Sequence, residues 1–246
     1  MANLLQTLGV QSYCFRGFKE IPALLAQVKS IGLSHCEVCG VHANFNDPST
    51  FEAVISQFKA ANIQITAIGV QTFKGDPNEE NWFRFAKAAG AKMISTTFDV
   101  SKTPAIFAAT EKLAEKYDLL LGIHNHGGYN WLGNSAMLQH VFNTTGERIG
   151  LCIDTAWCLQ SAEDPVKWAE QFNKRLYGLH IKDFTFDRAG KWTDVVVGTG
   201  NLKLKEFLAA AMTAPRLTVT TLEYEGDIQN PGPKLKECVE EIKKAS

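Results

Sequence analysis

Eight short apolar runs, each suited to a buried strand, alternate along the chain with longer stretches of helical pattern. Such alternation yields parallel strands that are joined by helical crossovers. The expected strands are residues 7–13, 34–38, 63–70, 92–98, 119–125, 149–154, 176–182 and 217–225. Eight strand-and-helix units in 246 residues match a closed (β/α)₈ barrel, which takes roughly 250 residues. We therefore predict this α/β fold.

The stretches between the strands carry signals typical of helix ends. Gly32, Asn62 and Gly90 close three of them just before a strand, where a residue that tolerates left-handed geometry is favoured. The expected helices are residues 20–32, 49–62, 78–90, 103–117, 164–172, 202–212 and 234–245. An open doubly wound sheet is the rival, but segment 12–18 lacks the glycine-rich phosphate turn of that fold. Because no linker, repeat or low-complexity stretch interrupts the pattern, we expect one domain over residues 1–246.

Composition excludes several classes of partner. The 25 Lys and Arg residues nearly balance the 26 Asp and Glu residues, so the formal net charge of -1 gives no long-range attraction for nucleic acid. The chain opens without the pattern of a signal peptide, and nowhere do 18 apolar residues run together. We expect a cytoplasmic protein with no membrane partner.

Cys36 and Cys39 form a C-x-x-C pair, but no second pair follows to complete a structural zinc site.

Polar residues that end apolar strands carry the most weight, because the active sites of barrels lie at the carboxyl ends of the strands. The last four expected strands end in such residues, namely His124, Asp154, His180 and Glu223. Each alone has an ordinary explanation, as a helix cap, a core histidine or a surface carboxylate. Four successive strand ends together predict one metal site. Two imidazoles and two carboxylates suit Mn²⁺, Co²⁺, Zn²⁺ or Fe²⁺ better than Mg²⁺ or Ca²⁺.

The segments around these residues resemble those of a known superfamily. They read IHNHGG (123–128), CIDTAW (152–157), LHIKDF (179–184) with a later GTGN (198–201), and LEYEGD (222–227). They are similar to the strand ends of xylose-isomerase-like barrels, which include sugar epimerases, hydroxypyruvate isomerase, inosose dehydratase and endonuclease IV. The resemblance spans the chain from residue 9 onward. It implies that His124, Asp154, His180 and Glu223 hold one divalent metal, with Mn²⁺ favoured and Mg²⁺ less suited, and that Glu223 or a neighbour moves protons.

Two departures from the superfamily pattern narrow the chemistry. Many of its isomerases and epimerases carry a glutamate where this chain has His124, and the H-N-H run looks closer to inosose dehydratases. Trp157 stands where many relatives have a histidine that serves the substrate or an additional metal. Since an indole cannot coordinate a metal, the three-metal phosphodiester chemistry of endonuclease IV is disfavoured.

Further residues are expected to surround the substrate. Lys182 could neutralise an oxyanion or form a salt bridge at the rim, and His126 could be an acid, a substrate contact or a partner of a metal ligand. Trp157 could stack on a sugar ring. The amides of Gly198 and Gly200 could approach an anion, unless their loop is merely short and flexible. The remaining expected contacts at the mouth are Glu37, His42 and Arg16.

The leading functional hypothesis is a metal-dependent isomerase or epimerase that acts on a keto- or aldo-sugar through an enediolate, with Glu223 as the base. A lyase or dehydratase that acts on a keto-sugar or inosose shares the first proton abstraction and is favoured by His124 in place of glutamate. A third hypothesis, from a different class, is a sugar-binding barrel without catalysis. Barrels of this superfamily often form dimers or tetramers, which leaves a homo-oligomer open.

Overall fold

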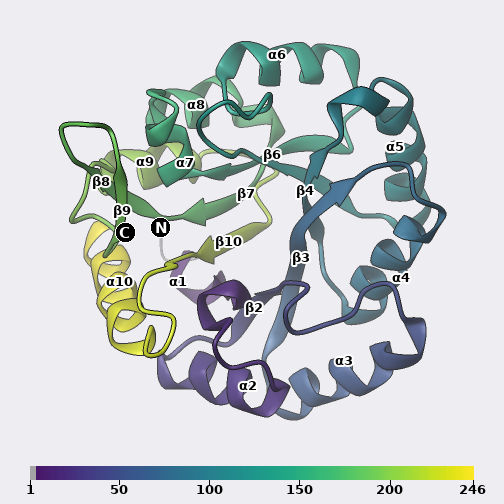
Figure 1. Cartoon of the computed structure of the whole chain (residues 1–246), viewed down its shortest axis with the longest axis horizontal. Coiled ribbons are helices and arrows are strands. Elements are labelled where there is room, and N and C mark those ends of the chain that lie inside the picture. The colour runs from purple at the N-terminus through teal and green to yellow at the C-terminus, as the bar shows by residue number, and fades with distance from the viewer. Residues whose placement is uncertain (1–3) are drawn as a thin grey trace.

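The computed structural model, which describes residues 4–246, contains a closed barrel of eight parallel strands (Figure 1). The strand order around the barrel is β1, β10, β7, β6, β5, β4, β3, β2. The bounds are β1 Leu8–Gln11, β2 His35–Val38, β3 Gln64–Phe73, β4 Met93–Phe98, β5 Leu120–His124, β6 Ile149–Asp154, β7 Leu176–Ile181 and β10 Val219–Leu222. The predicted (β/α)₈ barrel is confirmed, and each predicted strand overlaps one barrel strand.

Helices surround the barrel on the outside, as Figure 1 shows. They are α1 Leu4–Thr7, α2 Ile21–Ser30, α3 Phe51–Ala60, α4 Glu80–Ala89, α5 Ala105–Tyr117, α6 Ser135–Thr144, α7 Thr155–Gln160, α8 Pro165–Gln171, α9 Leu204–Ala211 and α10 Gly232–Ala245. Short 3₁₀ helices span Ser12–Phe15, Pro48–Thr50, Pro77–Glu79, Val100–Lys102 and Asn173–Arg175. Asn62 and Gly90 have φ angles of 54° and 76°, so the expected helix-ending signals act as left-handed caps.

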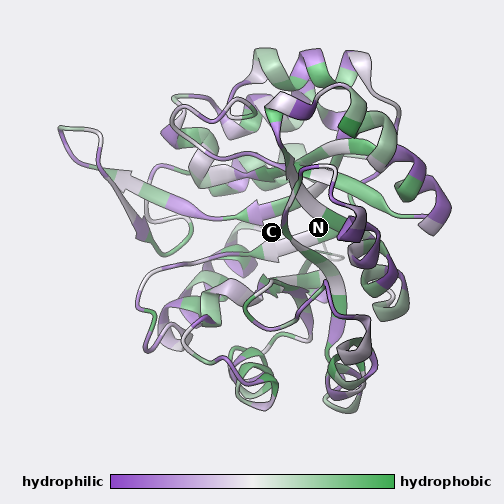
Figure 2. Ribbon diagram, turned by 45° about the vertical axis from the view of Figure 1, so that its right-hand side comes forward, coloured by the Kyte–Doolittle hydropathy of each residue, from purple (hydrophilic) through white to green (hydrophobic). Residues whose placement is uncertain are grey.

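The core has two parts. A large apolar shell fills the space between the strands and the helices, and Figure 2 shows hydrophobic and hydrophilic residues alternating along those helices. A small cluster inside the barrel contains Ala67, Met93, Cys152, Tyr177 and Val219. Met93 occupies space that opposing glycines leave open, since a Cβ on Gly122 would lie 2.6 Å from its sulfur. This filled interior forms a floor beneath the carboxyl ends of the strands.

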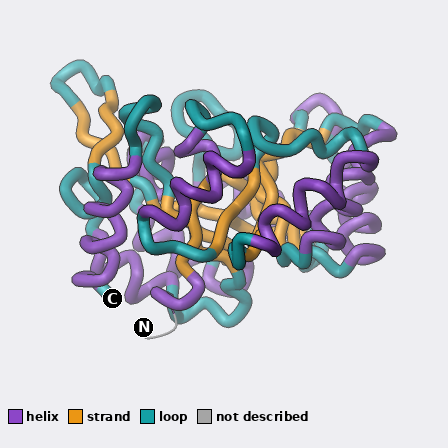
Figure 3. The backbone as a smooth tube through the Cα atoms, turned by 90° about the horizontal axis from the view of Figure 1, so that it is seen from below, coloured by secondary structure: helices purple, strands orange, loops and turns teal. Residues whose placement is uncertain are grey.

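Several elements were not predicted from the sequence, among them α1, α6, α7 and the strands β8 and β9. Helix α6 follows a polar loop and is capped by Asn134, whose side chain accepts a hydrogen bond from the Met137 amide. Helix α7 begins directly at the end of β6. Strands β8 (Asp183–Phe186) and β9 (Trp192–Val195) form an antiparallel hairpin after β7, and Figure 3 shows it extending beyond the ring of helices.

The eighth barrel strand ends at Leu222, earlier than expected, so Glu223 and Glu225 lie just past it.

Among residues 4–246, no helix combines the length and the hydropathy that a membrane span requires.

Asp183 ties the segment after the hairpin to the end of β7. Its buried carboxylate accepts hydrogen bonds from the backbone amides of Gly198 at 3.0 Å and of Gly200, Asn201 and Leu202 at 2.9 Å each. Burial raises the pKa of Asp183, while these four amide donors oppose that rise. The anion that the glycine loop surrounds is therefore a side chain of the protein itself.

We predict that Asp183→Asn destabilises the fold by about 2–4 kcal/mol, because the new amide group turns donors toward backbone donors in a buried place. Urea unfolding followed by circular dichroism measures this change. Asp187→Asn is the matched control, since Asp187 lies exposed at the hairpin turn and accepts only from Ala189 and Lys191. Equal stabilities of the two variants would contradict the anchoring role.

Candidate metal centre

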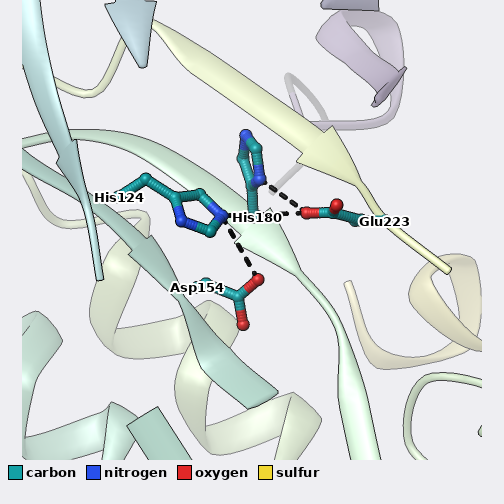
Figure 4. Close-up of side chains that lie close together, drawn as sticks. All are labelled: His124, Asp154, His180 and Glu223. Atoms are coloured by element: carbon teal, nitrogen blue, oxygen red, sulfur yellow. Dashed lines mark hydrogen bonds and ion pairs between the residues drawn. The ribbon is translucent and has the colours of Figure 1, made fainter. Parts of the chain in front are cut away.

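Four polar side chains converge at the carboxyl ends of four neighbouring strands. His124 ends β5, Asp154 ends β6, His180 lies in β7 and Glu223 follows β10, and Figure 4 shows all four pointing toward one another. One potential ligand atom from each lies within 4.8 Å of the other three. All four residues are at most 6% exposed. The structure thus brings together the four residues that the sequence had singled out.

Three atoms of this cluster lack hydrogen-bond partners, His124 Nδ1, His124 Nε2 and Asp154 Oδ2, and the last two face each other. His124 Nε2 lies 3.4 Å from Asp154 Oδ2 and 3.9 Å from Glu223 Oε2, and neither approach is a hydrogen bond. A buried polar atom without a partner costs about 1–3 kcal/mol. A cation between the imidazole and the carboxylate would satisfy both atoms, because each offers a free lone pair. The cluster therefore fits a divalent metal, and the buried His, Asp and Glu side chains could bind one.

Asp154 serves the fold and the cluster at the same time. Its Oδ1 accepts a hydrogen bond from the Trp157 amide at 2.8 Å and so caps α7. Its Oδ2 faces the cluster. Asn125 fixes the backbone here, because its side chain accepts from the Asp154 amide at 2.8 Å and donates to the Asp154 carbonyl at 3.0 Å. Asp154 can therefore cap the helix with Oδ1 and still offer Oδ2 to a metal.

Glu37 lies beneath the cluster instead of at the mouth. Its Oε2 is 2.9 Å from His180 Nε2 and accepts a hydrogen bond from the Thr221 hydroxyl at 3.3 Å. His180 Nδ1 lies 2.7 Å from Glu223 Oε2, so the ring bridges two carboxylates. Burial opposes charge on the ring, but Glu37, Cys152 and Glu223 together outweigh it, Glu37 foremost, and raise the pKa of His180 well above its usual value. Glu37 is fully buried and does not line the cavity. The structure therefore places it against His180 and not in the substrate-contacting position that the sequence suggested.

Lys182 is buried among carboxylates. Its ammonium forms an ion pair with Glu225 and lies 3.8 Å from Asp194 and 4.0 Å from Glu223. Burial lowers the pKa of Lys182, but these neighbours, Glu223 foremost, outweigh it and raise that pKa above its ordinary value. Lys182 therefore stays charged at neutral pH and can donate hydrogen bonds but cannot act as a base. The salt-bridge interpretation matches its contacts.

A cavity of about 460 Å³ opens above the cluster, within the size range of small-molecule sites. His124, Glu223 and Glu225 line it together with His126 and Trp157, which were expected there. Burial and the nearby His124 lower the pKa of His126 to about 4, so its imidazole is neutral at physiological pH. The other lining residues are Gln11, Tyr13, Cys39, Gly40, Val41, Gly69 and Val70.

The structure places four other expected substrate contacts away from this cavity. His42 uses both ring nitrogens in hydrogen bonds within the fold. Its Nδ1 lies 3.1 Å from the Ser12 hydroxyl, and its Nε2 lies 3.1 Å from the Phe18 carbonyl. Arg16 donates to the Glu225 carbonyl at 2.6 Å and stacks on the Tyr13 ring. The amides of Gly198 and Gly200 are occupied by Asp183. In each case the polar groups are already used within the fold.

Sequence reasoning missed several residues around the site. Asp194 belongs to the unpredicted hairpin; its Oδ2 accepts from the Glu225 amide at 2.9 Å, and burial raises its pKa to about 7. No local pattern pointed to it, because its neighbours come from β7 and from the segment after β10. Asn125 was visible in the H-N-H run, but its role depends on the register between β5 and β6. Cys39 was noted only as part of a C-x-x-C pair.

Known proteins resemble this chain in sequence or in fold. A 3-oxo-isoapionate decarboxylase of Pectobacterium atrosepticum is 24% identical over 216 residues, which cover 79% of this chain and 77% of that protein. Among solved structures, a D-allulose 3-epimerase from Methylomonas sp. is 14% identical with a TM-score of 0.74, over 98% of both chains. The IolI protein with a bound zinc atom is 14% identical with a TM-score of 0.72, over 97% of this chain and 96% of that one. The likeness to the two structures shows the fold alone.

A family model described as the xylose isomerase-like TIM barrel matches residues 25–245. This match covers nearly the whole barrel, including all four residues of the cluster. The chain belongs to the xylose isomerase-like TIM barrel family.

Proposed function

We propose that this protein is a divalent-metal-dependent enzyme that isomerises or epimerises a sugar through an enediolate. The observation that carries the proposal is the pair of unpartnered buried atoms, His124 Nε2 and Asp154 Oδ2, in a cluster that opens into a cavity. The metal ligands in this proposal are His124, Asp154, His180 and Glu223. When bound, the ion supplies Lewis-acid stabilisation of the negative charge that develops on substrate oxygens, worth several kcal/mol.

Glu223 is the proposed base. It lines the cavity, and its Oε1 lies 4.0 Å from the Lys182 ammonium. Burial raises the pKa of Glu223, but Lys182 and His180 outweigh it and hold that pKa well below the usual range. The carboxylate is therefore ionised and able to accept a proton from a C–H bond next to a carbonyl. Lys182 would then stabilise negative charge near the reacting atoms.

His126 and Trp157 are proposed substrate contacts. The neutral His126 imidazole lines the cavity and can exchange hydrogen bonds with a sugar hydroxyl. The Trp157 ring offers an apolar face and is held by edge contacts with Phe184 and Trp192, at centroid distances of 5.1 and 5.2 Å. We favour Mn²⁺ among the divalent ions, because two imidazoles and two carboxylates suit it better than Mg²⁺.

A lyase is the second candidate. The match to a decarboxylase, which is a carbon–carbon lyase, favours it, as does the histidine at position 124. Both reactions begin with a charge that develops next to a carbonyl. They differ in whether a group leaves from the substrate, so the products distinguish them.

We predict that the purified protein binds close to one equivalent of Mn²⁺, Co²⁺ or Zn²⁺ and that Asp154→Asn and His180→Ala lose most of it. Asp154→Asn keeps an oxygen to cap α7, so the fold should survive. Elemental analysis after dialysis gives the metal content. His140→Ala, at an exposed position in α6, is the control and should retain the metal. Full metal content in both site variants would show that the ligand assignment is wrong.

We predict that the metal-loaded protein incorporates solvent deuterium into a sugar next to its carbonyl, and that Glu223→Gln slows this by about 100-fold or more per bound metal. Nuclear magnetic resonance of aldoses and ketoses incubated in deuterium oxide measures the uptake. An isomeric product identifies an isomerase or epimerase, whereas loss of water or carbon dioxide identifies a lyase. Metal binding without uptake into any sugar would favour the non-catalytic sugar-binding barrel.

We predict that Glu37→Gln weakens metal affinity by roughly 10- to 100-fold, because a carboxylate that holds a ligating histidine orients its ring and raises its basicity. Isothermal titration calorimetry with Mn²⁺ measures the affinity. Glu79→Gln is a matched control, since Glu79 is also buried but accepts only from the amides of Lys74 and Gly75. An unchanged affinity in Glu37→Gln would remove the positioning role.

A further inference from the structure

The fixed charges on the wall of the cavity are all of one sign. Glu223 and Glu225 line it, whereas no lysine or arginine within residues 4–246 does. Proteins usually hold the phosphate or carboxylate of a ligand with the guanidinium of arginine or the ammonium of lysine. An anionic group that entered this cavity would instead meet two carboxylates. The wall therefore differs in its chemistry from a site built for a sugar phosphate or a sugar acid.

Lys182 lies behind this wall, and Glu225 covers its charge. The ammonium forms an ion pair with Glu225, and the Lys182 side chain is 1% exposed against 26% for that of Glu225. Asp194 and Glu223 lie 3.8 and 4.0 Å from the same ammonium. Three carboxylates thus share one cation. An anion could reach Lys182 only by displacing Glu225, which is the most exposed of the three carboxylates.

The other donors that the sequence suggested for a substrate are occupied as well. Arg16 donates to the Glu225 carbonyl at 2.6 Å and does not line the cavity. The amides of Gly198 and Gly200 donate to the Asp183 carboxylate at 3.0 and 2.9 Å. Each of these groups already serves an acceptor of the protein itself, so none of them provides a ready-made site for an anion.

A bound divalent cation would not reverse the sign of the charge. The two carboxylates among the proposed ligands would match its two charges, and Glu225 matches Lys182. His180 would be neutral as a metal ligand, so the buried Glu37 beside it would remain as a further negative charge. A phosphate monoester adds nearly two negative charges at neutral pH. Like charges at short range in a partly buried site repel each other strongly.

We propose that the cavity takes sugars that carry neither a phosphate nor a carboxylate, and that Glu225 is the specificity-determining residue that excludes the charged ones. This inference rests on the proposed function and names its substrate class. The Trp157 ring offers an apolar face to the C–H groups of a sugar, and the Glu225 carboxylate can accept hydrogen bonds from hydroxyls. Because a decarboxylase must bind a carboxylate, loss of water becomes the favoured lyase reaction over loss of carbon dioxide.

The charge selectivity of the cavity can be measured without knowing the substrate. Acrylamide is a neutral quencher of indole fluorescence, and iodide is an anionic one. The signal of Trp157 is the difference between the zinc-loaded protein and its Trp157→Phe counterpart, at constant ionic strength. We expect the ratio of iodide to acrylamide quenching of Trp157 to rise about threefold or more in Glu225→Gln. The reason is that the Lys182 ammonium lies 5.6 Å from the centre of the Trp157 ring and would lose its counter-charge.

Two further variants separate this effect from a general change of charge or a loss of structure. Glu237→Gln is the matched control, because it also removes one negative charge from an ion pair, that with Lys234 at 2.9 Å, but on the surface of α10. It should leave the quenching ratio unchanged. Glu225→Asp keeps the negative charge and should keep the low ratio of the wild type. Circular dichroism of each variant verifies the fold. An equal ratio in Glu225→Gln and the wild type would overturn the role of Glu225.

Turnover gives the second readout. Deuterium uptake by the metal-loaded protein is compared between D-fructose and D-tagatose and their 6-phosphates. We expect uptake into the phosphates to be about 10-fold slower or more, through a higher KM, and the gap to narrow in Glu225→Gln. Equal or faster uptake into the phosphates would overturn the inference and leave the proposed function standing. No uptake from any sugar, free or phosphorylated, would overturn the proposed function, and the quenching ratio would still decide whether the cavity excludes anions.

Discussion

Parallel closure of the barrel forces the carboxyl ends of all eight strands onto one face. Residues as far apart in the chain as Glu37 and Glu223 therefore meet around His180. The interior cluster around Met93 fills the barrel below them, so the polar groups at the strand ends rest on an apolar floor and cannot reach water from that side. Every feature of the site, including its burial and the unpartnered atoms of His124 and Asp154, depends on this geometry.

Charge is the second constraint, and it follows from the first. Five carboxylates gather at this face, those of Glu37, Asp154, Asp194, Glu223 and Glu225, and their nearest cationic partners are Lys182 and His180. Burial makes such an excess of negative charge costly. The raised pKa of Asp194 favours its uncharged form, which lowers the negative charge at this face. The positive charge of Lys182, which its carboxylate neighbours stabilise, offsets a further part of that negative charge. A divalent cation would neutralise most of the remainder, so the electrostatics and the unpartnered atoms favour the same ligand by independent reasoning.

The strands and the convergence of four strand-end residues could be predicted because both depend on local pattern. An apolar run that ends in a polar residue is visible in the sequence, and the barrel then places all such ends together. The partner of each side chain could not be predicted in this way. The sequence left open whether the amides of Gly198 and Gly200 approach an anion or belong to a merely short and flexible loop; they do face an anion, but it is the side chain of Asp183. Glu37 was expected at the mouth, yet its side chain points into the barrel toward His180. Asp194 lies in strand β9, which has only four residues and no buried residue in its pattern, so no periodicity revealed it.

The hairpin shows why one unpredicted element affects the whole site. Asp194 on β9 accepts from the Glu225 amide, and Glu225 in turn holds Lys182. On the same hairpin Phe184 and Trp192 stack at 4.6 Å and press against Trp157, which is the apolar wall of the cavity. Trp157 and Glu225 line the cavity and are held in place by contacts with this hairpin, whereas Gln11 in β1 and Cys39 after β2 line another part of it. A substrate in this cavity would therefore meet an aromatic face and a carboxylate from one part of the wall and polar groups of a different kind from another.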